Sequence, residues 1–216
     1  SSARGTCGTM TASVSTAPAT SMSEADLSTA QAAVLAHLRQ FFAGHRVDVR
    51  ESPDRVQERI PRFRIAAVDP GPVIDKHVYV SMGCWDAVHD AEHGLEFVLI
   101  APDAAPRHAL LVAVTAYYHA NPDDATFRLD LGHSVPIGEP WSPGSLCDHL
   151  LVSLPYPFGP ELEVCAWDGG HARLLWLLPI TAAERDFEVA NGLEALEQRF
   201  DAAALAYWDS RRGSVV

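Results

Sequence analysis

Short runs of β-branched and aromatic residues, separated by clusters of Pro and Gly, are the feature that most restricts how this chain folds. Runs of this composition, bounded by turn-forming residues, are typical of β-strands. They occupy residues 46–50, 63–68, 77–82, 95–101, 127–131, 149–154, 161–167 and 172–178. We therefore expect a mixed or antiparallel sheet, with the very apolar segment 172–178 as a central strand.

Apolar residues at helical spacing predict two helices outside these runs. The first extends from a cap at Ser23 to Gly44. The second begins at a cap formed by Asp103 and stops at Asn121-Pro122, because the residue before a proline disfavours helical geometry. Its apolar positions are Leu110, Leu111, Val114, Tyr117 and Tyr118. We expect this second helix to cover one face of the sheet.

The clearest local signal is the Thr-Ala-Ala-Glu sequence that runs from Thr181 to Glu184. Thr and Glu three residues apart form a capping box, in which each side chain satisfies a free backbone N–H group at a helix start. Asn191-Gly192 should end or bend this helix, and a further amphipathic helix should follow over 193–207. Together with the strands, these helices predict an α/β (α+β) fold: a mixed, largely antiparallel central sheet flanked by helices.

The 216 residues are enough for one substantial hydrophobic core. Residues 1–22 are mainly Ser, Thr, Ala and Gly, so we expect a disordered tail followed by a single domain over 23–216. The four cysteines are too few and too scattered for a disulfide framework. Apolar stretches long enough to span a membrane are absent from the sequence, so a cytoplasmic location is expected.

Acidic residues outnumber basic ones by 28 to 16, which gives a formal net charge of -12. This charge opposes binding to nucleic acid and to anionic membranes, because both attract positively charged proteins. We therefore expect a protein partner, and a basic one suits the charge best.

The segment from His89 to His93 matches the H-x-x-E-H pattern of zinc peptidases, in which two His hold zinc and the Glu acts as base. The pattern needs a long helix that fixes both imidazoles. Here Gly94 follows at once, and the strand-like residues 95–99 begin. We interpret the segment as a polar loop and expect neither a metal site nor a cofactor. Zinc-dependent hydrolysis by His89, Glu92 and His93 is kept as an alternative hypothesis.

Nucleophilic catalysis also lacks a recognisable pattern in the sequence. Ser134 stands beside His133, but the chain contains no G-x-S-x-G turn that would expose a serine nucleophile. Cys147 and His149 would share one face of a strand, where a buried thiol is the commoner outcome. We expect no catalytic residue and no enzymatic activity.

Three segments, taken together, resemble the Suppressor of fused domain in order and spacing. Residues 77–83 with 94–99 show a strand ending in Ser-x-Gly and a Gly-x-Glu-Phe strand, 148–155 a His-Leu-Leu strand, and 175–184 a hydrophobic strand leading to a Pro-Ile helix start. The resemblance extends from about residue 27 to the end. It implies an α/β domain that binds proteins, since eukaryotic members hold a transcription factor and related bacterial domains are thought to be immunity proteins against toxins.

The same resemblance implies a set of partner-binding residues. Eukaryotic members take the partner peptide as an added strand near a helix end and the following strand, where a Tyr and a Gly-Asp pair lie. Tyr117 matches the Tyr, and Gly132-His133 matches the pair with His in place of Asp. Loss of that carboxylate removes a charge-assisted contact, so we expect a different partner even if the edge serves β-augmentation.

The leading hypothesis is a bacterial-type, non-catalytic domain that sequesters or neutralises a protein partner. Such a domain would be an immunity protein against a toxin effector encoded nearby. Two alternatives stay open: the zinc-dependent hydrolase described above, and a structural subunit of a larger complex. The sequence leaves the oligomeric state undetermined.

Overall fold

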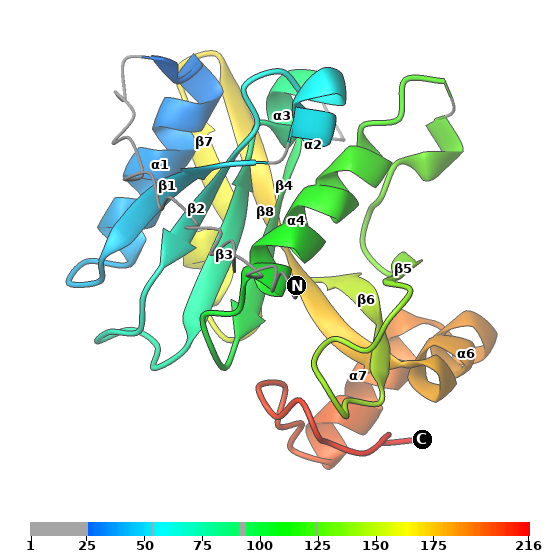
Figure 1. Ribbon diagram of the computed structural model, residues 1–216. Coiled ribbons are helices and arrows are strands. Elements are labelled where there is room, and N and C mark those ends of the chain that lie inside the picture. Colours follow the sequence, from blue (N-terminus) through cyan, green and yellow to red (C-terminus); the bar gives the residue numbers. More distant parts are fainter. Residues whose placement is uncertain (1–25, 53, 91–93, 124) are drawn as a thin grey trace, which may run out of the picture.

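The computed structural model describes residues 26–52, 54–90, 94–123 and 125–216, so the predicted tail of residues 1–22 lies outside the described residues. The described strands form one sheet in the order β1-β2-β3-β4-β8-β6-β5, and β7 pairs with β8 beside this path (Figure 1). The strands are β1 (Val47–Glu51), β2 (Arg64–Val68), β3 (His77–Met82), β4 (Leu95–Ala101), β5 (Ser134–Pro136), β6 (Cys147–Ser153), β7 (Val164–Trp167) and β8 (Gly170–Thr181).

The sheet is mixed, with one parallel pair at its centre. β4 and β8 run parallel, and the other described pairs are antiparallel. A parallel pair needs a long crossover, which is supplied by the chain between residues 102 and 169. All residues of β4 are buried, as expected for a strand covered on both faces. The predicted α/β fold with a mixed, largely antiparallel sheet flanked by helices is therefore confirmed.

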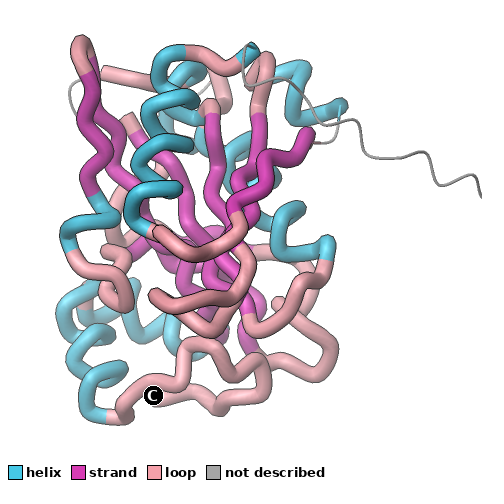
Figure 2. The backbone as a smooth tube through the Cα atoms, turned by 90° about the vertical axis from the view of Figure 1, so that its left-hand side faces the viewer, coloured by secondary structure: helices cyan, strands magenta, loops and turns pink. Residues whose placement is uncertain are grey.

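Helices cover both faces of this sheet (Figures 1 and 2). On one face lie α2 and α4, and α4 buries Leu111 and Ala116 there. On the other lie α1, α5 and α7, which bury residues such as Leu38 and Leu196. No described helix combines the length and the apolarity that crossing a bilayer requires. The helices are α1 (Thr29–Phe41), α2 (Asp54–Arg59), α3 (Cys84–Ala87), α4 (Pro106–His119), α5 (Pro160–Glu163), α6 (Ala182–Asn191) and α7 (Leu193–Ala202), with a 3-10 turn over Ala125–Phe127.

The alternation of side chains along the strands separates two hydrophobic cores. In β4, Phe97 and Leu99 pack toward α4. Val98 and Ile100 pack toward α1 on the opposite face. Successive strand residues point to opposite faces, so β4, which is apolar at every position except Glu96, joins both cores.

The first helix begins later than the sequence predicted. Its cap is Ser28 and not Ser23, because Ser28 forms a capping box with Gln31. The Ser28 hydroxyl accepts a hydrogen bond from the Gln31 N–H at 3.1 Å, and the Gln31 side chain accepts one from the Ser28 N–H at the same distance. Two reciprocal bonds satisfy more of the free N–H groups than a lone serine.

The predicted strand over residues 127–131 is wrong. The chain there forms the end of a 3-10 turn and an extended segment that packs on α4. The Phe127 ring meets the Tyr118 ring edge-on at 4.9 Å between centroids. The Leu129 N–H donates to Nδ1 of His119 at 2.9 Å. Packing against α4 therefore replaces strand pairing, and the strand that does form is β5.

Several other elements also differ from the prediction. The segment 161–167 divides into α5 and the short β7, since Pro160 at the first turn favours a helix. The last helix ends at Ala202, so Tyr207 lies in the loop beyond it. The short helices α2 and α3 were not predicted.

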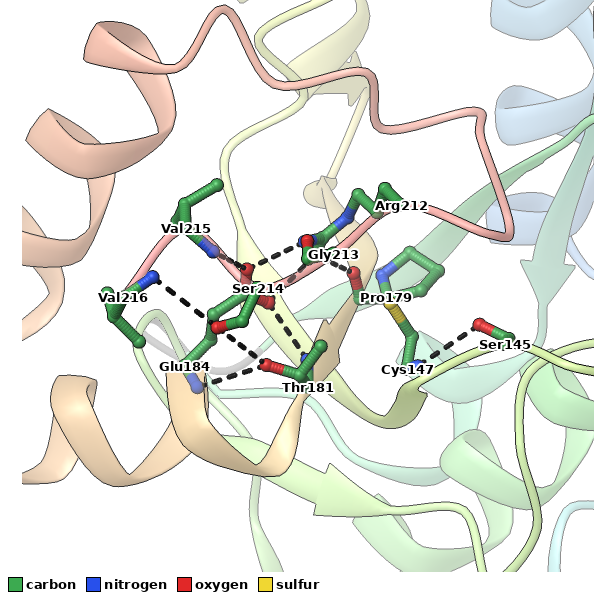
Figure 3. Close-up of polar contacts among 10 residues, drawn as sticks. All are labelled: Ser145, Cys147, Pro179, Thr181, Glu184, Arg212, Gly213, Ser214, Val215 and Val216. Atoms are coloured by element: carbon green, nitrogen blue, oxygen red, sulfur yellow. Dashed lines mark hydrogen bonds and ion pairs between the residues drawn. The ribbon is translucent and has the colours of Figure 1, made fainter.

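The capping box at Thr181 and the break at Gly192 are confirmed. The carboxylate of Glu184 also ties down the C-terminal segment (Figure 3). Arg212 donates from Nη1 to Oε1 of Glu184 at 2.6 Å and from Nη2 to Oε2 at 2.8 Å. The N–H of Val215 donates to Oε1 as well, at 3.1 Å. The chain after α7 is thus fastened to the start of α6.

Candidate partner-binding surface

The outer side of α4 leaves two apolar side chains uncovered. Leu110 is 45% exposed and Val114, one turn later, is 49% exposed, although Leu111 and Ala116 on the inner side are packed on the sheet. Tyr117 follows in the next turn and is partly buried. Residues three and four apart share one side of a helix. We call Leu110, Val114 and Tyr117 the α4 face.

Sequence reasoning assigned Leu110 and Val114 to the packed side of the helix, and the structure corrects this. A helix that covers a sheet needs one apolar stripe, whereas α4 has apolar residues on two sides. The sequence of α4 contains more apolar positions than one packed stripe requires. This excess was the sequence signal that a second side of the helix is apolar.

Tyr117 also lines a cavity of about 770 Å³ between the ends of α2, α3 and α4. We call this cavity the Tyr117 groove; its wall includes Arg59, Asp86, Tyr117, Asn121, Pro122 and Arg128. The Arg59 guanidinium carbon lies 3.7 Å from the centre of the Tyr117 ring, and Nη1 donates to the Tyr117 carbonyl at 2.7 Å. The cation–π contact and the hydrogen bond hold both side chains in place. The groove therefore presents an ordered pair of the residue types that anchor protein interfaces.

Gly132 and His133 continue the pairing of β5 with β6. The Gly132 N–H donates to the Val152 carbonyl at 2.9 Å, and the Val152 N–H donates to the His133 carbonyl at 2.8 Å. Gly132 has φ +82°, a conformation that residues with a side chain rarely adopt. Nδ1 of His133 accepts a hydrogen bond from the Asp130 N–H at 3.1 Å. The glycine is thus required by the turn that leads into β5.

A carboxylate from another helix stands near this turn. A Cβ atom at Gly132 would lie 3.8 Å from Oε1 of Glu188 on α6. Burial raises the pKa of Glu188, and the nearby His133 acts in the opposite direction. An acidic group is therefore present beside the position where the family pattern has Asp. The sequence did not reveal it because Glu188 is distant along the chain.

The predicted binding residues divide between two places. Tyr117 packs on Arg59 near the end of α4, whereas Gly132 and His133 join β6 and adjoin α6. Figure 1 shows the chain leaving the end of α4 and returning to the sheet at β5. The role of the three residues in binding stays a prediction.

The predicted zinc motif falls partly outside the described residues, which exclude Glu92 and His93. α3 ends at Ala87, before His89. The His89 ring stacks on Trp85 with centroids 4.1 Å apart, and Nδ1 contacts the Trp85 carbonyl oxygen at 3.0 Å. Within the described ranges, no cluster of three His, Cys, Asp or Glu side chains is arranged to hold a metal ion.

The cysteine thiols in the described part of the chain lie in the hydrophobic cores. Cys84, Cys147 and Cys165 are buried. Burial is the largest cause that raises the pKa of each thiol, to about 11 for Cys165. A raised pKa disfavours the thiolate, which is the nucleophilic form.

The Ser-x-Gly and Gly-x-Glu motifs meet around the carboxylate of Glu96. The Ser81 hydroxyl donates to Oε2 of Glu96 at 2.5 Å and accepts from the Phe97 N–H at 2.8 Å. The N–H groups of Gly83, Cys84 and Trp85 donate to the same carboxylate at 2.8, 3.3 and 3.2 Å. Glu96 thereby fastens the end of β3 and the start of α3 to β4.

Two further features explain the composition of these motifs. Burial raises the pKa of Glu96 to about 7, although the hydrogen bonds from Ser81 and from the backbone act in the opposite direction. Gly94 is required because a Cβ there would lie 2.5 Å from Nε1 of Trp85. The motif residues therefore hold the framework together and do not form an open site.

Comparison with known proteins agrees with this arrangement. The family model described as Suppressor of fused protein (SUFU) matches residues 61–213. A search of curated proteins gave no match.

Solved structures of the same kind are similar over most of the chain. A Suppressor of fused homologue from Neisseria gonorrhoeae is 36% identical, with a TM-score of 0.70, over 87% of this chain and 97% of that one. A structure of the Sufu–Fu complex is 15% identical, with a TM-score of 0.64, over 86% and 92%. Drosophila Suppressor of Fused is 14% identical, with a TM-score of 0.59, over 86% and 51%. The family match and the Neisseria relative show that this chain belongs to the Suppressor of fused family.

Proposed function

We propose that this chain is a non-catalytic protein-binding domain that holds its partner on the α4 face and in the Tyr117 groove, and so sequesters or neutralises it. The observation that carries this proposal is the exposure of Leu110 and Val114, at 45% and 49%, on a helix whose other side is packed. Exposed apolar side chains next to an ordered Arg and Tyr pair are typical of protein interfaces. A protein surface with an apolar centre and a polar rim would cover them.

The charge of the chain supports a basic partner. A net charge of -12 would steer a positively charged protein toward this domain and would repel nucleic acid and anionic lipid. Together with the similarity to a bacterial homologue, the charge supports an immunity protein that neutralises a basic toxin effector.

The edge of the sheet at β5 offers a secondary contact. β5 spans three residues and includes Pro136, which has no N–H to donate. So short an edge limits the length of an added strand. We therefore assign the main contact to the α4 face and a supporting contact to Gly132 and His133.

The test is capture of the product of the neighbouring open reading frame by the purified domain. The wild-type chain is compared with a Leu110→Ser/Val114→Ser variant, which removes apolar contact area at exposed positions. Loss of two apolar side chains from an interface should weaken binding by about tenfold or more. Val189→Ser is the matched control, because Val189 is 70% exposed on α6.

The expected result is capture by the wild-type chain and by Val189→Ser, with a marked loss for the α4 variant. Failure of the wild-type chain to capture any specific protein at low salt would contradict the proposed function. Equal capture by all three chains would contradict the choice of the α4 face.

A further inference from the structure

A second cavity lies on the side of the sheet opposite α4. It has a volume of about 490 Å³ and lies between β6, β8, α7 and the C-terminal loop. Its floor is formed by Trp176, Leu178 and Phe200, which belong to the core beneath α1 and α7. The volume is within the range of about 300–1,000 Å³ that is common for ligand sites.

Aromatic rings form the sides of this cavity. The Tyr207 ring stands edge-on to Trp176, with centroids 5.1 Å apart and an interplanar angle of 87°. Tyr156 lines the mouth and is 57% exposed. The faces of Trp and Tyr rings attract cations, because their π systems are negative there.

Two carboxylates one helical turn apart line the same cavity. Glu197 and Asp201 project from α7. Oε1 of Glu197 accepts a hydrogen bond from the Tyr156 hydroxyl at 3.0 Å. Burial raises the pKa of Glu197, the hydrogen bond from Tyr156 acts in the opposite direction, and the negative charges of Asp201 and Glu194 raise the pKa further. A cation bound here would therefore relieve repulsion between negative charges.

Two contacts fix the segment after α7 that forms one wall of the cavity. The tie between Arg212 and Glu184 anchors the segment after α7, which carries Tyr207 (Figure 3). The N–H of Leu205 donates to the Phe200 carbonyl at 3.0 Å, which folds this segment back toward α7. A site that is formed before binding loses less entropy when it is filled.

We propose that this cavity is an anchor site for an arginine side chain of a protein partner. The aliphatic stem would lie on the apolar floor, and the guanidinium would stack on Tyr207 and pair with Glu197 and Asp201. A guanidinium suits these walls because it is planar, stacks on aromatic rings and donates to two carboxylate oxygens at once. The open mouth beside exposed Tyr156 leaves room for the chain that carries the arginine. The inference rests on the proposed function and adds a contact on the other face of the sheet.

The experiment is a titration of the full chain with the peptide acetyl-Gly-Arg-Gly-amide, followed by the NMR signal of the Trp176 indole. The peptide acetyl-Gly-citrulline-Gly-amide is the probe control, since citrulline has nearly the same shape without the charge. We expect saturable binding of the arginine peptide, about tenfold weaker binding of the citrulline peptide, and a similar loss in a Glu197→Gln/Asp201→Asn variant. Asp168→Asn, which neutralises an exposed carboxylate in the turn between β7 and β8 and outside the cavity wall, should bind like the wild type.

Equal binding of both peptides, or binding that survives in the Glu197→Gln/Asp201→Asn variant, would overturn the site. A Tyr207→Leu variant with an unchanged unfolding curve should also bind the peptide more weakly, because it keeps an apolar side chain and removes the ring on which the guanidinium would stack. The Leu110→Ser/Val114→Ser variant should bind the peptide normally. If the chain captures a partner but does not bind the arginine peptide, the result contradicts the arginine site alone. If it binds the peptide but captures no partner, the result contradicts the proposed function alone.

Discussion

Glu184 and Glu96 are both buried, at 0% and 1% exposure, yet their surroundings differ. Glu184 faces the guanidinium of Arg212. Glu96 is surrounded by neutral donors, the Ser81 hydroxyl and three backbone N–H groups. A buried charge is stable when a partner of opposite charge compensates it, whereas a carboxylate without one tends to hold its proton. The comparison predicts that loss of Arg212 lowers the stability of the fold through Glu184. A change of pH should alter the stability through Glu96.

The largest effect is expected for Arg212→Ala. Removal of the guanidinium leaves the Glu184 carboxylate buried without a compensating charge, which should lower the free energy of unfolding by about 3–5 kcal/mol. The measurement is urea denaturation at neutral pH. Arg211→Ala is the control, because Arg211 is adjacent in the sequence and exposed. A loss of less than about 1 kcal/mol would mean that the tail is not fastened by this ion pair.

The second effect is a pH dependence that originates at Glu96. Its pKa is about 7 in the folded chain, against an ordinary value of 4.5. Between these two values the folded state holds the proton and the unfolded state releases it. The contribution of Glu96 to the free energy of unfolding is therefore fully present at low pH. It is lost as the pH rises toward 7, by about 3 kcal/mol in total.

Glu96→Gln tests this directly, because glutamine is neutral at every pH. The difference in unfolding free energy between the variant and the wild type should change by about 3 kcal/mol in favour of the variant between pH 4.5 and 7.5. A constant difference across that range would contradict the assignment.

The smallest effect is expected for Thr181→Ala. The hydroxyl of Thr181 accepts the Glu184 N–H at 3.2 Å and donates to the Ser214 hydroxyl at 3.2 Å. Loss of these neutral hydrogen bonds should cost about 1 kcal/mol. The result separates the neutral bonds of Thr181 from the ion pair between Arg212 and Glu184. A loss as large as that in Arg212→Ala would show that the two contacts cannot be separated.

The sequence predicted the structural features that depend on residues close together in the chain. The capping box needs residues three apart, and the strands β3 and β4 were predicted with the observed bounds because Gly and turn residues limit them on both sides. The tie from Arg212 to Glu184 joins residues far apart in the chain, and no pattern indicates it. The same holds for Glu188 beside Gly132 and for the donors around Glu96.

The sequence also could not show which apolar residues of α4 are exposed. Leu110 and Val114 have the same spacing as buried residues of α4, and their exposure depends on which side of the helix meets the sheet. The cavity beside α7 likewise requires Tyr156, Trp176 and Tyr207 from separate segments to meet. The family motifs therefore revealed the framework, whereas Leu110, Val114 and Tyr117 of the α4 face lie outside the three motif segments.

The central claim is that binding resides on the α4 face and is separable from the framework. The most direct measurement pairs the affinity for the captured partner, by isothermal titration, with the free energy of unfolding for Leu110→Ser/Val114→Ser. We predict about tenfold or weaker binding with a change in unfolding free energy within about 0.5 kcal/mol, as for exposed positions. Unchanged affinity in a folded variant would contradict the claim.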